Sequence, residues 1–427
     1  MPVAYRGRIL ISPPKPSIED GVIVVNHGQI VQIGGEIPAG VSVVDLNEKN
    51  SSTSGGVAIL PGLVNAHTHL EFSDLKAPLG EPGMPFPDWI RSVIQYRLNE
   101  QSGQRVEMRE GRSRIQHGLD ECIRSGTTTI GEISKPDAPW TSDASTAPDV
   151  APAASLTAFI ELLGLGEDRS ERATSELDAA QQRLRQQCPR WQMGVSSHAP
   201  YSTHWKLVQE MCRYSREHQL PLAMHLAESP EELELLRTHG GPFRQLLDEI
   251  GVWNSSAFQL GVTTMEYLQQ LATAHRALVI HGNYLNEQEI AFVAKHKERM
   301  SVVYCPRTHT YFQHATHPLP RILSTGVNIA LGTDSRASTP DLDMMAELRH
   351  VAKTHPSLSP EMILPMGTMA GAKALGMADH VGSLEIGKRA DLAVFALPNE
   401  PNGDALEALL NDSLPCVATV VAGKLYE

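Results

Sequence analysis

The chain has 427 residues, of which 41% are hydrophobic and 20% charged, a composition typical of a folded protein with a large core. Its formal net charge is -13 and it has no lysine or arginine run, which argues against a nucleic-acid partner and against an anionic membrane surface. No apolar stretch approaches the roughly 18 residues of a membrane span, and residues 1–6 lack the form of a signal peptide, so we expect a cytoplasmic protein.

The cysteines are scattered, with an odd total and no C-x-x-C pair: Cys122, Cys188, Cys212, Cys305 and Cys416. This pattern argues against a disulfide framework and against a cysteine-held zinc. It also argues against the zinc deaminases whose signature is H-x-E followed by P-C-x-x-C. Any metal in this chain must therefore be held by nitrogen and oxygen ligands.

Both ends of the chain predict short β-strands separated by turn residues. The predicted strands lie at 8–11, 21–25 and 29–35 near the N-terminus, and at 390–395 and 416–423 near the C-terminus. Neither end is large enough to form a stable sandwich alone. We therefore expect 1–56 and 379–427 to pair into one composite β-sandwich domain.

The central region, 57–378, alternates apolar runs of strand length with helical patterns. The runs are 57–64, 126–131, 156–162, 191–196, 222–225, 277–281, 300–305 and 327–332, and helical patterns include 231–239, 286–296 and 344–352. Eight strand-helix units predict an α/β fold, a (β/α)₈ TIM-like barrel, with a doubly wound sheet as the structural alternative. Residues 133–155, rich in Pro, Ala, Ser and Asp, are expected to form a loop or lid.

Histidines and acids follow these predicted strands, where the active site of a barrel forms. In chain order they are His67 and His69, His198, His225 and Glu228, His281, and Asp334. On this count His198 follows the fifth strand, or the fourth if one strand is miscounted. Two imidazoles two residues apart on a strand point the same way and can reach one ion. Three imidazoles and a carboxylate would hold a divalent ion and leave a position for water.

Each of these residues also has a structural interpretation. His198 or His281 alone could equally be a buried core histidine. Glu228 is placed to be a first-turn helix acid, and Asp334 to cap a turn. Four further histidines are expected in loops: His204, His309, His314 and His317. The joint occurrence of the strand-end residues favours a site.

The strand ending L-P-G-L, H-T-H at 67–69, H-L-A-E at 225–228, His281 and G-T-D at 332–334 together resemble the amidohydrolase superfamily. More narrowly they resemble its deaminase and chlorohydrolase branch, which includes cytosine, guanine and methylthioadenosine or S-adenosylhomocysteine deaminases and triazine hydrolases. The segment 382–392 resembles the family's return into its small β-domain. The match covers nearly the whole chain.

The resemblance implies one divalent metal ion held by His67, His69, His225 and Asp334, with zinc expected first and iron or manganese as alternatives. It makes Glu228 the proton shuttle, gives His281 the task of orienting or polarising the metal-bound water, and lets Asp334 accept the water proton. Two-metal members carry a bridging lysine on the fourth barrel strand. The run at 156–165 has none, and Glu161 is the alternative bridging carboxylate there.

The implied activity is hydrolytic deamination of an amino-substituted N-heterocycle, most specifically an adenine-nucleoside-like compound such as methylthioadenosine, S-adenosylhomocysteine or aminodeoxyfutalosine. His198 resembles a substrate-contacting histidine, Trp89 is placed to stack on a ring, and Glu71 and Arg336 stand where the chain departs from the adenosine-type pattern. The alternatives are a chlorohydrolase or cyclic amide hydrolase, a guanine- or cytosine-type deaminase, and a non-catalytic metal-binding scaffold. The expected partner is a small molecule, and a homodimer is left open.

Overall fold

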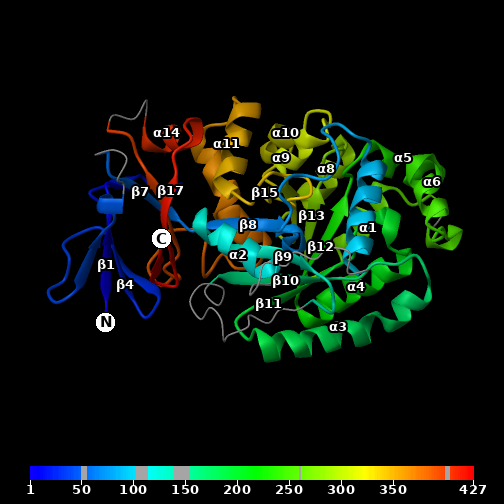
Figure 1. The fold of residues 1–427 in the computed structure, drawn as a ribbon, viewed down its shortest axis with the longest axis horizontal. Helices are drawn as coiled ribbons and strands as arrows, with labels where there is room; N and C mark the ends of the chain where they lie inside the picture. Colours follow the sequence, from blue (N-terminus) through cyan, green and yellow to red (C-terminus); the bar gives the residue numbers. More distant parts are fainter. Residues whose placement is uncertain (50–54, 102–113, 139–153, 259–260, 400–403) are drawn as a thin grey trace.

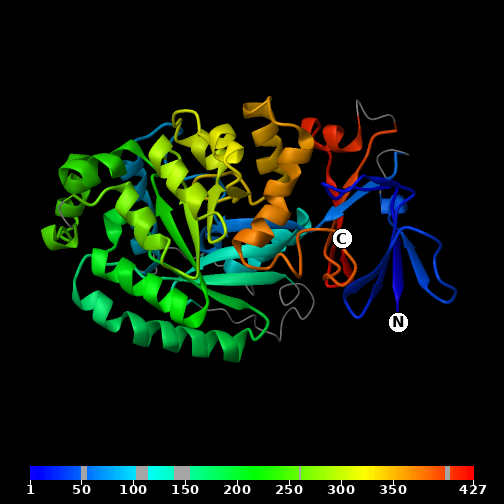
Figure 2. The same ribbon diagram turned by 180° about the vertical axis from the view of Figure 1, so that it is seen from behind.

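The computed structural model describes residues 1–49, 55–101, 114–138, 154–258, 261–399 and 404–427. Two parts lie side by side in Figure 1, a small β-rich part that contains both termini and a larger part in which helices surround strands. Figure 2 shows the same arrangement from behind. Among the described residues no helix combines the length and the apolar character needed to cross a membrane.

The larger part is built on an eight-stranded parallel sheet whose strands follow one another in sequence order. The strands are β8 (Leu63–Thr68), β9 (Thr127–Ser134), β10 (Ser155–Glu161), β11 (Gln192–Ser196), β12 (Pro221–Leu226), β13 (Arg276–His281), β14 (Met300–Tyr304) and β15 (Asn328–Leu331). The first strand meets the chain just after the last one, where the Asp334 amide donates to the His67 carbonyl at 3.1 Å. The Thr68 hydroxyl donates to the Asp334 carbonyl at 2.7 Å. This closure confirms the predicted barrel and rules out the doubly wound sheet.

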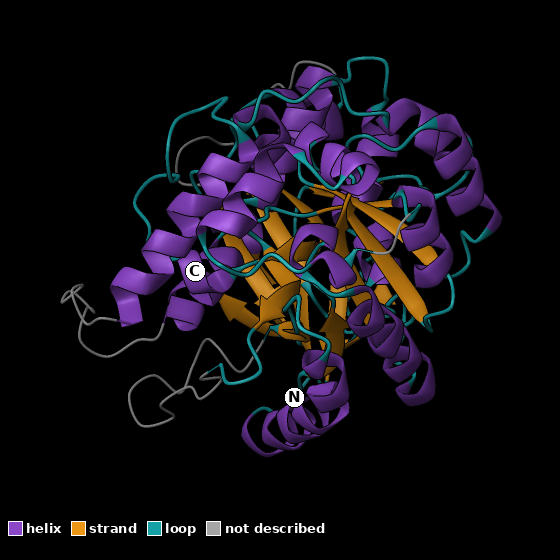
Figure 3. Ribbon diagram, turned by 90° about the vertical axis from the view of Figure 1, so that its right-hand side faces the viewer, coloured by secondary structure: helices purple, strands orange, loops and turns teal. Residues whose placement is uncertain are grey.

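Helices cover the outside of the barrel, as the end-on view in Figure 3 shows. The three helices expected from periodicity are confirmed as α5 (Pro230–Thr238), α8 (Glu287–Lys295) and α11 (Met344–Thr354). The other α-helices are α1 (Phe86–Gln101), α2 (Arg114–Arg124), α3 (Asp168–Gln187), α4 (Trp205–His218), α6 (Gly241–Glu249), α7 (Thr264–Leu271), α9 (Pro306–Tyr311), α10 (Leu319–Ser324), α12 (Pro360–Ile363), α13 (Met369–Ala374) and α14 (Ala405–Asn411). Short 3-10 helices are η1 (Leu46–Lys49), η2 (Leu70–Phe72), η3 (Pro200–Ser202), η4 (Ser255–Ala257) and η5 (Leu364–Gly367).

Alternation along β12 shows how a strand presents a histidine to the barrel interior. Leu222 and Met224 belong to the large cluster under the helices, whereas Ala223 packs with residues of the other barrel strands, such as Phe159 and Ile280. Side chains two apart on a strand face the same way, so His225 points inward like Ala223. The strand therefore places this imidazole over the packed barrel interior.

The smaller part has two sheets. One is four-stranded, in the order β5-β4-β1-β6, and the other is six-stranded, in the order β18-β17-β16-β7-β2-β3. Their strands are β1 (Val3–Arg6), β2 (Ile9–Leu10), β3 (Ile18–Glu19), β4 (Val22–Asn26), β5 (Gln29–Ile33), β6 (Ser42–Asp45), β7 (Val57–Pro61), β16 (Leu392–Ala396), β17 (Cys416–Val421) and β18 (Lys424–Tyr426). The six-stranded sheet joins N-terminal and C-terminal strands, which confirms the expected composite domain.

The strand expected over 57–64 is in fact two strands in different sheets. β7 pairs with β16 and β2 in the small part, and only β8 enters the barrel. Gly62 separates them, and a Cβ at this position would lie 2.2 Å from the Thr128 hydroxyl oxygen, so no larger residue fits the crossing. The first barrel strand therefore starts at Leu63. The domain limits at 56/57 and 378/379 stay predictions, and most of the loop expected at 133–155, namely 139–153, lies outside the described residues.

Candidate active site

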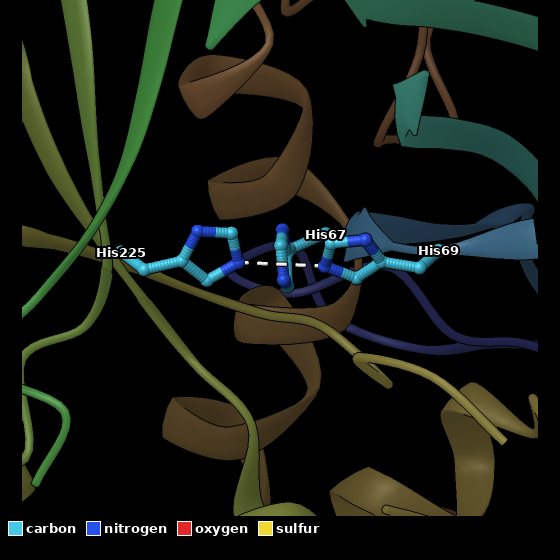
Figure 4. Close-up of side chains that lie close together, drawn as sticks. All are labelled: His67, His69 and His225. Atoms are coloured by element: carbon cyan, nitrogen blue, oxygen red, sulfur yellow. Dashed lines mark hydrogen bonds between the residues drawn. The ribbon is translucent and has the colours of Figure 1, made fainter. Parts of the chain in front are cut away.

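Three histidines meet above the barrel interior. His67 lies in β8, His69 follows that strand, and His225 lies in β12, and ligand atoms of all three lie within 4.8 Å of one another. The Nε2 atoms of His69 and His225 are 3.4 Å apart, as the dashed line in Figure 4 marks, and the His67 ring centroid lies 4.9 Å from the centroid of each of these two rings. Oδ1 of Asp334 lies 3.7 Å from Nε2 of both His67 and His69.

The nitrogen atoms of this cluster suit a divalent cation. Both ring nitrogens of His67 and Nδ1 of His69 are buried and have no hydrogen-bond partner among the described residues. Nδ1 of His225 lies 3.0 Å from the His198 carbonyl oxygen, so it carries the proton and leaves the lone pair on Nε2. Burial and the neighbouring His67 lower the pKa of His225 to about 3. His225 is therefore suited to act as a neutral electron-pair donor, as a metal ligand must be.

The backbone is strained at the strand ends that carry the site. His198, Ala227, His281 and Asp334 have φ values of 35, 54, 68 and 57°, in the left-handed region that favours glycine. Such a conformation costs on the order of 1–3 kcal/mol per residue and persists only where the surroundings enforce it. Here the left-handed conformation turns the chain away from the direction of the strand, either at a residue of the cluster or at a residue next to the cluster.

Glu228 and His281 form a buried pair next to the histidine cluster. Oε1 of Glu228 lies 3.2 Å from Nε2 of His281, and the two residues are 3% and 2% exposed. Burial, followed by the charges of Asp334 and Glu232, raises the pKa of Glu228 well above its ordinary value. Burial and then His225 lower the pKa of His281 well below its ordinary value. Burial thus disfavours the charged form of both side chains.

Asp334 is fixed by a neighbour that sequence reasoning missed. The hydroxyl of Ser338 donates to Oδ2 of Asp334 at 3.0 Å, and the hydroxyl oxygens of Ser338 and Thr308 lie 2.9 Å apart. The two carboxylate oxygens of Asp334 therefore have different neighbours: Oδ1 faces His67 and His69, and Oδ2 accepts a hydrogen bond from Ser338. A serine four residues after the aspartate was visible in the sequence, but its contact depends on the fold of the loop.

The predicted substrate contact His198 lies beside the cluster. It follows β11, the fourth barrel strand, so the count that placed it after the fifth strand is corrected to the alternative. Its ring centroid is 5.2 Å from that of His225 and 5.6 Å from that of Tyr201. Nδ1 of His198 contacts the Ser202 hydroxyl, which leaves Nε2 as its other ring nitrogen for a ligand.

The other three predicted contacts have partners within the protein. The Trp89 indole stacks on Phe86 and donates to the Ala337 carbonyl at 3.0 Å, with 8% of the residue exposed. The Glu71 carboxylate pairs with Arg97 and Lys135. The Arg336 guanidinium donates to the Leu75 carbonyl at 2.8 Å and to Glu121 at 2.6 Å. Trp89 and Arg336 thereby tie the loops around α1 to the segment after β15.

Glu161 takes part in a second group of potential ligands. Ligand atoms of Glu161, His198 and His225 lie within 4.8 Å of one another. Glu161 ends β10, which is the third barrel strand and not the fourth, so the run at 156–165 is not the strand on which a bridging lysine is expected. The fourth strand, β11, reads Gln-Met-Gly-Val-Ser and has no lysine either.

Comparison with known proteins gives concordant matches. A model described as the amidohydrolase family matches residues 58–426. The aminodeoxyfutalosine deaminase of Deinococcus radiodurans is 28% identical over 329 residues, which cover 75% of this chain and 74% of that protein. The 5-methylthioadenosine/S-adenosylhomocysteine deaminase of Syntrophobacter fumaroxidans is 27% identical over 406 residues, which cover 90% of this chain and 82% of that protein.

Solved structures share the fold. The Helicobacter pylori aminofutalosine deaminase in complex with methylthio-coformycin superimposes with a TM-score of 0.81 and 21% identity over 100% of both chains. The atrazine chlorohydrolase of Arthrobacter aurescens TC1 complexed with zinc gives a TM-score of 0.78 and 19% identity, covering 99% of this chain and 94% of that chain. The family match spans the barrel and each histidine and acid of the cluster described above. This chain belongs to the amidohydrolase family and is a hydrolase of carbon–nitrogen bonds.

Proposed function

We propose that the protein is a metal-dependent hydrolytic deaminase that acts on an adenine-nucleoside-like compound. The observation that carries the proposal is the buried Glu228 carboxyl group, whose pKa is raised by burial, facing His281 beside a cluster of three imidazoles and one carboxylate. Two relatives with this family's sequence pattern bear the names aminodeoxyfutalosine deaminase and 5-methylthioadenosine/S-adenosylhomocysteine deaminase. Methylthioadenosine, S-adenosylhomocysteine and aminodeoxyfutalosine are therefore the first candidate substrates.

The family implies a divalent metal, and the orphaned buried nitrogens of His67 and His69 support its place here. We propose that His67, His69, His225 and Asp334 hold one ion, with zinc first and iron or manganese as alternatives. When bound, such an ion lowers the pKa of water toward about 7 and so supplies a nucleophile at neutral pH.

The side chains of this chain then carry the protons. Water adds to the ring carbon that bears the amino group, and we assign its released proton to Oδ1 of Asp334, the oxygen that Ser338 does not hold. Glu228 donates its carboxyl proton to the ring nitrogen, then takes up the remaining proton of the added hydroxyl as the ring carbonyl forms and passes it to the departing amine, which leaves as ammonia. The proton held by Asp334 then returns to Glu228. His281 fixes the Glu228 carboxyl from 3.2 Å and orients the attacking water.

Substrate contacts are proposed at the mouth of the barrel. His198 keeps one ring nitrogen for a heterocycle next to His225. Trp89, Glu71 and Arg336 remain candidates, and because each already has protein partners, they would contact substrate while also holding the loops. The expected partner is a small molecule. We further propose a cytoplasmic location. We also propose a homodimer, and light scattering of the purified protein tests this oligomeric state.

A second candidate function is hydrolysis of a halide or a cyclic amide on a related ring by the same water. The structural likeness to a chlorohydrolase favours keeping this candidate. A guanine- or cytosine-type deaminase is the third. A non-catalytic metal scaffold does not require an acid beside the ligands, so the Glu228–His281 pair disfavours it.

Ammonia release by the zinc-loaded protein tests the proposal. The panel holds methylthioadenosine, S-adenosylhomocysteine, aminodeoxyfutalosine, guanine, cytosine and aminopterins, with atrazine and a cyclic amide as controls for the second function. We expect ammonia from at least one adenine nucleoside. Release from guanine or cytosine alone would transfer the assignment to base deamination, and chloride release or ring opening without ammonia would transfer it to the second function.

A further inference from the structure

The turn that carries Glu228 is held from two sides. On one side, residues that follow β13 donate to the three successive carbonyls of residues 226–228. The Gly282 amide donates to Leu226 at 3.1 Å, the Tyr284 amide to Ala227 at 3.0 Å, and the Asn283 side-chain amide to Glu228 at 2.9 Å. Glu228 therefore lies on a turn that is hydrogen-bonded to the segment directly after His281, the last residue of β13.

On the other side, a single carboxylate accepts both amides of the same turn. Oε1 of Glu232 accepts from the Ala227 amide at 2.8 Å, and Oε2 accepts from the Glu228 amide at 3.0 Å. Glu232 is in the first turn of α5 and is 0% exposed. The start of α5 does not need this carboxylate, because the Ser229 side chain caps it by accepting from the Glu232 amide at 3.2 Å.

We propose that Glu232 is a positioning residue, whose carboxylate holds the Ala227–Glu228 peptide so that the Glu228 side chain faces His281. The inference rests on the proposed function for its effect on turnover. Ala227 has a φ of 54°, a left-handed conformation that an alanine rarely adopts unless fixed by its contacts. A carboxylate can accept at both oxygens, whereas an amide at position 232 would turn an N–H donor toward a backbone N–H. Glu232 is thus the one side chain that satisfies both amides of the strained turn.

Glu232→Gln tests this role, with Glu234→Gln as the matched control on the same helix. We expect Glu232→Gln to lower kcat of the zinc-loaded enzyme by about 10- to 100-fold, the usual effect of losing an outer contact to an active-site group, with KM and zinc content unchanged. In a Glu228→Gln background the same substitution should cause no further loss, because its effect passes through Glu228. Glu234→Gln should match the wild type throughout.

Hydrogen exchange separates this inference from the proposed function. In the metal-free wild type the amides of Ala227 and Glu228 should exchange slowly, and in Glu232→Gln they should exchange fast while the rest of α5 stays protected. Retained protection of these amides, or losses in kcat that are additive with Glu228→Gln, would overturn the role of Glu232. Absence of ammonia release by the wild type would overturn the proposed function alone.

A second variant serves if Glu232→Gln does not fold. Asn283→Ala frees the Glu228 carbonyl from the opposite side of the turn and leaves the helix intact. We expect the same loss in kcat at constant KM, again absent in the Glu228→Gln background. Unchanged turnover of Asn283→Ala together with failure of Glu232→Gln to fold would mark Glu232 as a folding residue and refute its positioning role.

Discussion

Oε1 of Glu228 lies 3.2 Å from Nε2 of His281, and both side chains are buried, Glu228 on the turn after β12 and His281 at the end of the neighbouring strand β13. Burial raises the pKa of the carboxyl group and lowers the pKa of the imidazole, so the charged form of each is disfavoured. A neutral acid can donate a proton at neutral pH, which an ordinary glutamate cannot. This relationship is the basis for the proposed role of Glu228 as proton donor.

Replacing Glu228 with glutamine should keep the shape of the pair and remove the proton. We expect Glu228→Gln to lose about 10²- to 10⁴-fold in kcat, the usual contribution of general acid-base catalysis, with full metal content. Glu231→Gln, on the first turn of the following helix, is the control and should retain activity. The measurement is ammonia release beside metal analysis. Near-normal turnover of Glu228→Gln would leave the mechanism without its acid.

Removing a ligand should act through the metal. His225→Ala is expected to lose bound metal and activity together, and excess zinc should restore part of both, because affinity and not the acid is damaged. His296→Ala is the control, because the His296 ring lies against the Phe292 carbonyl on α8. An inactive His225→Ala protein that retains its metal would remove His225 from the ligand set.

The number of ions per chain tests the role of Glu161. We expect one equivalent of divalent metal in the wild type, held by the cluster of His67, His69 and His225 with Asp334. Elemental analysis that finds close to two equivalents would contradict this expectation. In that case a second ion at Glu161 and His198 is the place to look, and Glu161→Gln should bring the content back to one.

Ser338 contacts Oδ2 of Asp334 and not Oδ1, the oxygen that faces His67 and His69. We nevertheless expect Ser338 to affect metal binding. Ser338→Ala removes the donor to Oδ2 of Asp334, so the carboxylate can rotate away from His67 and His69. We expect metal affinity or kcat/KM to fall by about 10- to 100-fold with little change in thermal stability. Ser324→Ala removes a hydroxyl that donates to the Arg321 carbonyl on α10 and is the control. A zinc competition assay gives the affinity, and an unchanged value with unchanged kcat/KM would contradict the expected support.

The metal-free protein should lose stability as pH falls. Burial lowers the pKa of both His198 and His225 from 6.5 to about 3, so between these values the unfolded chain binds protons that the folded chain does not. The contribution of these neutral rings to the free energy of unfolding is therefore fully present above pH 6.5. It is lost as the pH falls from 6.5 toward about 3. Each contributes a slope of at most about 1.4 kcal/mol per pH unit. Urea unfolding of His198→Gln should show a shallower slope, whereas the exposed control His380→Gln should match the wild type.

Much of this architecture was predictable because its signals are local. The eight strands appear as apolar runs, the helices α5, α8 and α11 as 3.6-residue periodicity, and the candidate ligands as polar residues directly after the runs. Parallel strands in a barrel bring their carboxyl ends together, so position after a strand predicts proximity. The structure places His67, His69, His225 and Asp334 together for this reason.

What sequence reasoning missed depends on contacts between distant segments. The division of 57–64 at Gly62 is invisible in a uniformly apolar run, because the close neighbour Thr128 comes from another strand. The acceptor roles of Glu232 and the donor role of Ser338 arise from loop geometry, which no periodicity encodes. Trp89 and Arg336 were expected only at the substrate, and their bonds to the Ala337 and Leu75 carbonyls became visible with the loops in place.

The short passage from β7 to β8 across Gly62 has a consequence for the order in which the protein assembles. β7 has β2 on one side and β16, residues Leu392–Ala396, on the other. During synthesis the strand that leads into His67 and His69 therefore lacks one neighbour until nearly the whole chain has left the ribosome. A nascent chain halted before β16 would expose one edge of β7 to solvent.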